Sequence, residues 1–99
     1  MDNLEEMSKI AKSHDIPMHV DGCMGGFVIA FAKDAGYTLP PFDFTLPGVT
    51  SISADIHKYG KSPKGASVVM FRTAELRKYS IFSCVDWPGG LYATPTYAG

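Results

Sequence analysis

The chain has 99 residues, of which 45% are hydrophobic and 19% charged, and its formal net charge is -1 at pH 7. This composition is typical of one folded globular domain and excludes an intrinsically disordered chain. The charge balance gives no basic footprint for nucleic acid, and the longest apolar run, residues 27–32, is too short to cross a bilayer. We therefore expect no nucleic-acid partner, and membrane contact only through a segment outside this sequence.

Two cysteines do not make a disulfide framework, so we expect reduced thiols at Cys23 and Cys84.

The first part of the sequence predicts a helix, a strand and a second helix. Residues 3–14 carry apolar side chains at helical spacing, with Asn3 as the N-cap. Residues 17–21 form a short strand, and the apolar stretch that follows predicts a helix to about Ala35, buried on more than one side and ended by Gly36. The apolar stripe of the first helix comprises Leu4, Met7, Ile10 and Ala11.

The second part predicts two more strands and a short helix. Val49 to Ala54 forms a strand that completes a βαβ unit, so it should run parallel to the first strand. Residues 66–71 form a third strand of β-branched and aromatic character, and the short connection before it favours an antiparallel arrangement. Thr73 can cap a last helix, to about Tyr79. The fold class is therefore α/β, with a mostly parallel sheet and one antiparallel strand.

Residues 86–99 are aromatic and rich in turn-forming residues, and they hold no pattern of a closing helix or strand. We therefore expect residues 1–99 to be a partial domain whose two flanks lie elsewhere in a longer parent chain.

Polar side chains gather where the two parallel strands end. Asp21 closes the first strand, and Asp55, His57 and Lys58 follow the second. Ligands in open α/β sheets bind beyond the carboxyl ends of the strands, and neighbouring strands lie only about 5 Å apart. One small ligand could therefore contact both groups.

The lysine and the first aspartate fit the chemistry of pyridoxal phosphate. A lysine screened from water has a lowered pKa, and a neutral amine can attack an aldehyde to form a Schiff base. Lys58 is the candidate for that role. A carboxylate opposite a pyridine nitrogen keeps this nitrogen protonated, so that the ring can accept electrons. Asp21 is the candidate for this second role.

Several motifs together resemble those of the pyridoxal-phosphate group II decarboxylase family. They are His19-Val-Asp-Gly-Cys-Met-Gly-Gly26, Gly48-Val-Thr-Ser-Ile-Ser-Ala-Asp-Ile-His-Lys-Tyr-Gly60, Pro63-Lys-Gly65 and Asp86-Trp-Pro-Gly-Gly-Leu-Tyr-Ala-Thr-Pro95. The resemblance implies the central part of the large domain of a fold-type I enzyme, with pyridoxal 5'-phosphate as cofactor. The Schiff-base residue would be Lys58, and Asp21 would hold the ring nitrogen.

The resemblance also implies further cofactor-binding residues. His57 would lie near the cofactor phosphate, and Cys23 would pack under the ring. Ser53 and Asp55 would surround these groups. The sequence departs from the family at Gly22, where alanine is more common.

Within the family, the resemblance is to members that cleave a phosphorylated sphingoid long-chain base into a fatty aldehyde and phosphoethanolamine. It implies an aldehyde-lyase that is a homodimer on the cytosolic face of the endoplasmic reticulum membrane, or a cytoplasmic enzyme if the parent has no anchor. The isolated fragment should be inactive. An amino-acid decarboxylase on the same scaffold is the alternative, because the cofactor residues are shared.

Two other classes of function remain open. His19, Asp21 and Cys23 alternate along one strand face, and together with Asp55 and His57 they could bind a metal ion in a hydrolase. This hypothesis leaves Lys58 unexplained. The chain could also be a non-catalytic segment that folds only with a partner. His19 itself is most simply interpreted as a strand residue hydrogen-bonded to the backbone.

Overall fold

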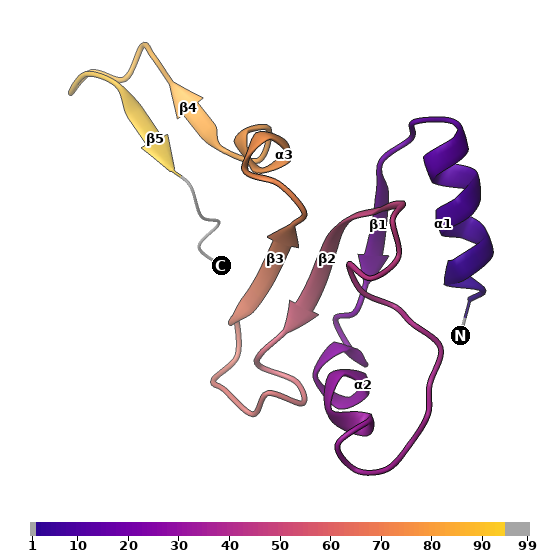
Figure 1. The fold of residues 1–99 in the computed structure, drawn as a ribbon. Coiled ribbons are helices and arrows are strands. Elements are labelled where there is room, and N and C mark those ends of the chain that lie inside the picture. The colour runs from indigo at the N-terminus through magenta and orange to yellow at the C-terminus, as the bar shows by residue number, and fades with distance from the viewer. Residues whose placement is uncertain (1, 95–99) are drawn as a thin grey trace.

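The computed structural model describes residues 2–94, and these form three helices and five strands (Figure 1). The helices are α1 (Leu4–Ser13), α2 (Gly26–Ala32) and α3 (Ala74–Lys78), and the strands are β1 (Met18–Asp21), β2 (Val49–Asp55), β3 (Ser67–Phe71), β4 (Phe82–Cys84) and β5 (Tyr92–Thr94).

Three strands form the sheet that positions the polar residues, in the order β1-β2-β3. The pair β1 and β2 is parallel, with Asp21 opposite Ser53, and the pair β2 and β3 is antiparallel, with Asp55 opposite Ser67. Both predicted orientations are confirmed. Within the described residues the sheet is mixed, since two parallel strands are followed by one antiparallel strand.

The two faces of this sheet differ in polarity because β-strand side chains alternate. Met18 and Val20 of β1 are buried, whereas His19 and Asp21, which alternate with them, are exposed. On β2, Val49 and Ile52 join the same core, which also contains Leu46, with Leu4, Ala11 and Phe44 packed against it. The polar face opposite this core carries His19 and Asp21.

Helix α1 begins as predicted, and it packs through half of the predicted stripe, with Leu4 and Ala11 against the core and Ser8 between them. The Asn3 side chain accepts a hydrogen bond from the Glu6 backbone N–H. Ser8 is the buried residue of the helix, and its hydroxyl accepts a hydrogen bond of 2.8 Å from the Gly48 N–H. A Cβ at position 48 would lie 2.2 Å from the Ser8 carbonyl oxygen, so the close approach needs glycine. Met7 and Ile10 of the predicted stripe are consequently exposed.

Helix α2 ends at Ala32, three residues earlier than expected. Gly36 has φ +84 and the Tyr37 N–H bonds to the Ala32 carbonyl, which is the glycine-terminated helix end that was predicted. The expected burial on several sides is wrong in the described residues, since only Gly26 of the helix is buried and Phe31 is 62% exposed. The helix contacts the sheet through Gly26, which lies against Ala54 of β2.

The stretch after α3 contains more structure than its sequence predicts. Strands β4 and β5 form an antiparallel pair separate from the main sheet, and Figure 1 shows this hairpin beyond α3. The rings of Trp87 and Tyr92 lie 5.3 Å apart and support the hairpin. The sequence pattern predicts neither strand, and residues 95–99 lie outside the described part. Among residues 2–94, no helix combines the length and apolar character needed to cross a membrane.

Candidate active site

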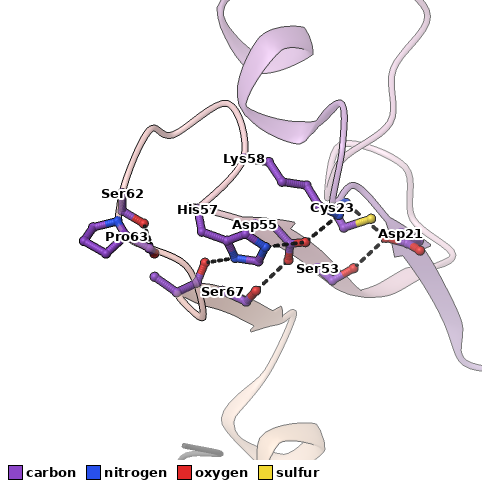
Figure 2. Close-up of polar contacts among 10 residues, drawn as sticks. Asp21, Cys23, Ser53, Asp55, His57, Lys58, Ser62, Pro63 and Ser67 are labelled. Carbon is purple, nitrogen blue, oxygen red and sulfur yellow. Dashed lines mark hydrogen bonds and ion pairs between the residues drawn. The ribbon is translucent and has the colours of Figure 1, made fainter. Parts of the chain in front are cut away.

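Asp21 lies at the carboxyl end of β1, where two neighbouring groups donate hydrogen bonds to one of its oxygens. Its Oδ1 accepts bonds of 3.0 Å from the Cys23 backbone N–H and 3.1 Å from the Ser53 hydroxyl. The parallel register explains the second bond, because it places Ser53 directly beside Asp21. The carboxylate is therefore fixed by both its own turn and the neighbouring strand (Figure 2).

His19 extends this arrangement along the same face. Its Nδ1 lies 2.8 Å from the Ser51 hydroxyl and its Nε2 lies 3.2 Å from the Ser53 hydroxyl. Because Ser53 donates its proton to Asp21, it can only accept from His19, which requires the proton on Nε2. The expected backbone partner of the His19 ring is thus replaced by two serine hydroxyls.

Lys58 lies in the turn after β2 and pairs with Asp55. The distance from its Nζ to Asp55 Oδ2 is 2.7 Å, and the two side chains are 32% and 15% exposed. The other oxygen of Asp55, Oδ1, accepts a 2.6 Å bond from the Ser67 hydroxyl of β3. The antiparallel register places Ser67 opposite Asp55, so all three strands of the sheet contribute to the site.

His57 faces the same carboxylate from the turn. Its Nδ1 lies 2.8 Å from the Ala66 carbonyl oxygen, and its Nε2 lies 3.8 Å from Asp55 Oδ2. A carbonyl oxygen can only accept, so Nδ1 carries a proton. The other ring nitrogen, Nε2, is the one that faces Asp55.

Cys23 connects the two halves of the site. Its backbone N–H donates to Asp21, its carbonyl oxygen accepts a 3.4 Å hydrogen bond from the Asp55 N–H, and its side chain is near enough to influence the pKa of both Asp21 and Lys58. Figure 2 shows Cys23 between these two side chains. The predicted residues Asp21, Cys23, Ser53, Asp55, His57 and Lys58 thus form one continuous group at the carboxyl ends of β1 and β2.

Both carboxylates of the group are held in the ionised form. Hydrogen bonds from the Cys23 thiol, the Cys23 N–H and the Ser53 hydroxyl lower the pKa of Asp21. Hydrogen bonds from Lys58 and Ser67 lower the pKa of Asp55. Each bond stabilises the charged form of its carboxylate. Two fixed negative charges therefore flank Cys23 and Lys58.

The electrostatics of Lys58 differ from the sequence-based expectation. Burial does oppose its charge, but the hydrogen bond to Asp55 is stronger and raises the pKa of Lys58 above its usual value. The expected lowering of the pKa is therefore wrong for this structure. The expectation treated the lysine as unpaired, whereas a carboxylate three residues earlier reaches it across the turn.

The shape of the surface around the group is only partly concave. A hollow of about 380 Å³ beside α1 and α2 is lined by His19, Asp21 and Gly22 among others, but Lys58 is not part of it. Hydrogen bonding defines the site better than this hollow does. Among residues 2–94, no three histidine, cysteine or acidic side chains come together as metal ligands would, so the metal-site hypothesis gains no support.

A family comparison decides the classification of the chain. Residues 1–85 match the model of the pyridoxal-dependent decarboxylase conserved domain. The chain belongs to this family. The fold is α/β with a mixed sheet, and the cofactor of the family is pyridoxal phosphate.

Curated relatives and a solved structure agree with this assignment. The chain is 52% identical over 99 residues to a sphingosine-1-phosphate lyase of Oryza sativa subsp. japonica and 55% identical over 100 residues to sphingosine-1-phosphate lyase 1 of Rattus norvegicus. Both matches cover 100% of this chain and 18% of the relative. A solved sphingosine-1-phosphate lyase of Burkholderia pseudomallei matches with a TM-score of 0.91 and 47% identity, over 100% of this chain and 23% of that one. The chain thus spans about a fifth of the length of these relatives.

Three polar residues of the group were missed as site residues. Ser51 contacts the His19 ring, and Ser67 donates a hydrogen bond to Asp55. His19 is the third, and its ring is hydrogen-bonded to the Ser53 hydroxyl. The alternation of serines at positions 51 and 53 along β2 was a usable signal, because both must face the side that carries His19 and Asp21. Ser67 could not be found in this way, since its position depends on the register between β2 and β3.

Proposed function

We propose that this chain is part of a pyridoxal phosphate-dependent lyase that cleaves phosphorylated sphingoid long-chain bases into a fatty aldehyde and phosphoethanolamine. The observation that carries the proposal is that Cys23 links the two ends of the site, because its N–H donates to Asp21 and its carbonyl oxygen accepts from Asp55, whose carboxylate pairs with Lys58. The similarity of the whole chain to sphingosine-1-phosphate lyases supports the choice of substrate.

The chemistry of the side chains fits the cofactor. Pyridoxal phosphate, when bound, supplies a ring that accepts electrons from the breaking carbon-carbon bond. Asp21 is an ionised carboxylate at a strand end, which suits it to hold a protonated ring nitrogen. Lys58 supplies the amine, and Figure 2 shows Lys58 and Asp21 on opposite sides of Cys23.

Each residue of the group then has a role of its own. Asp21 would bind the ring nitrogen and keep its proton in place. Lys58 would hold the cofactor aldehyde through Nζ and can carry a proton at that atom. Cys23 would pack against the ring, His57 would bind near the phosphate, and Ser53 would orient Asp21 through the hydrogen bond between them. Asp55 would orient Lys58.

The architecture of the parent protein is part of the same proposal. We infer that residues 1–99 form the central part of a fold-type I large domain, with one antiparallel strand, in a homodimeric enzyme. The match to the Burkholderia pseudomallei structure supports the fold. We further propose a location on the cytosolic face of the endoplasmic reticulum membrane. Light scattering of the protein that carries this chain would test the homodimer, and cell fractionation would test the location.

An amino-acid decarboxylase is the second candidate, because the matching family model is that of a decarboxylase domain. Product analysis separates the two functions. In what we call the rice graft, this chain replaces the matching segment of the Oryza sativa relative, with which it is 52% identical. We expect the rice graft to release fatty aldehyde and phosphoethanolamine from a phosphorylated sphingoid base.

The ungrafted rice relative serves as the control for this experiment. Release of carbon dioxide from amino acids by the rice graft, without aldehyde from the phosphorylated base, would favour the decarboxylase instead.

A further inference from the structure

The Asp55 carboxylate has two possible cationic partners at a single oxygen. Lys58 Nζ lies 2.7 Å from Oδ2, and His57 Nε2 lies 3.8 Å from the same atom. The second oxygen is occupied, because Oδ1 accepts the 2.6 Å hydrogen bond from Ser67. The carboxylate is therefore held in place by β3 and presents one oxygen to the lysine and the histidine of the turn.

Of the two partners, only Lys58 lies within hydrogen-bond distance of Oδ2 in this structure. Lys58 holds the shorter contact, and its ammonium charge opposes a second positive charge on the neighbouring ring. The Asp55 side chain is only 15% exposed, so its charge needs a partner within the protein. If Lys58 loses its charge, His57 is the other basic side chain beside Asp55 Oδ2. The Ala66 carbonyl already fixes the proton on Nδ1, so the gained proton must go to Nε2.

We propose that Asp55 is a positioning residue that exchanges its cationic partner, from Lys58 to His57, when Lys58 becomes neutral. In this exchange an Nζ–H bond of Lys58 breaks, the electron pair stays on the nitrogen, and His57 Nε2 gains a proton. The net charge of the cluster is unchanged. This inference rests on the proposed function in one respect, since attachment of Lys58 to an aldehyde requires the neutral amine.

The exchange also has a consequence for the site. A cation would remain beside Asp55 at every stage, and in the second stage this cation would be His57, the residue proposed to bind near the phosphate.

The titratable groups that face Lys58 and His57 come from two segments, with Cys23 from the turn after β1 and Asp55 from β2. Ser67 of β3 adds a hydrogen-bond donor without a charge.

The test compares two variants of Lys58 that differ in charge, Lys58→Gln and Lys58→Arg. Both are made in the full 99-residue chain and in the rice graft, without added cofactor. Modification of His57 by diethyl pyrocarbonate, which reacts with the neutral imidazole, is measured against pH by peptide mass spectrometry. We expect the midpoint for His57 to lie about one pH unit higher in Lys58→Gln than in Lys58→Arg.

His14 at the end of α1 is the internal control, since it lies on a different element from the cluster. Adding Asp55→Asn to both variants should abolish the difference, whereas adding Asp43→Asn should preserve it. Equal midpoints for His57 in the two Lys58 variants, or a lower one in Lys58→Gln, would overturn the proposal. Because no cofactor is present, this result does not depend on whether the enzyme cleaves its proposed substrate.

A second measurement uses the chain with Lys58 intact. Acylation of Lys58 by an amine reagent should reach its midpoint at lower pH in Asp55→Asn than in the unaltered chain, because the carboxylate raises the pKa of Lys58. Lys61 and Lys64 in the same connection are internal controls. An unchanged Lys58 midpoint in Asp55→Asn would equally contradict the role given to Asp55.

Discussion

Replacing Lys58 by alanine in the rice graft should lower kcat for cleavage of the phosphorylated base by about 10,000-fold or more. The variant removes both the amine proposed to hold the cofactor and a group that can carry a proton at the reacting centre, and losses of this size accompany removal of a covalent catalytic residue. Lys58→Arg should be equally inactive, because an arginine keeps the charge but cannot supply a neutral amine. The measurement is the rate of aldehyde release under single-turnover conditions.

Lys61→Gln provides the matched control for this prediction. Lys61 lies in the connection between β2 and β3, as Lys58 does, and it is exposed and outside the motifs shared with the family. Its removal should leave the rate within about twofold, as expected for surface residues away from a site. Residual activity of Lys58→Ala within tenfold of the unaltered graft would contradict the proposed role.

Replacing Asp21 by asparagine should lower kcat by about 100- to 1000-fold, the usual cost of removing one preorganised electrostatic group. Asparagine keeps the size of the side chain but loses the charge that would stabilise a protonated ring nitrogen. Asp21→Glu keeps the charge and should restore part of the activity. The measurements are the rate of aldehyde release and the visible absorbance of the bound cofactor, whose pH dependence should shift in Asp21→Asn.

Asp43 offers a closely matched control for Asp21. Its Oδ1 also accepts hydrogen bonds from a backbone N–H and a hydroxyl, both of Thr45, and these bonds also lower the pKa of Asp43. It is not among the residues of the site. Asp43→Asn should therefore keep near-full activity with an unchanged spectrum. Similar losses in the two variants would indicate that Asp21 acts through stability alone.

The sequence was sufficient to predict the elements that carry the site. Alternation along β1 separates Met18 and Val20 from His19 and Asp21, and the structure places the first pair in the core and the second on the polar face. The parallel arrangement of β1 and β2 followed from the helix between them, and it brings Asp21 beside Ser53. These predictions depended on local patterns and on the rules of chain connection.

The remaining features depended on contacts that a local pattern does not contain. The charge state of Lys58 is controlled by Asp55, and Asp55 in turn is held by Ser67 through the register with β3. Burial of Ser8 rather than Met7 depends on the close approach of Gly48 to α1. The hairpin of β4 and β5 was missed because its strands have three residues each and are separated by Pro88, Gly89 and Gly90.

Mapping of the cofactor attachment site tests the central claim most directly. The 99-residue chain and the rice graft are each incubated with pyridoxal phosphate, reduced with borohydride and digested, and the modified lysine is identified by mass spectrometry. We predict that the graft carries one modification, at Lys58, and that Lys61 and Lys64 remain unmodified. Modification spread over exposed lysines with none enriched at Lys58 would contradict the account.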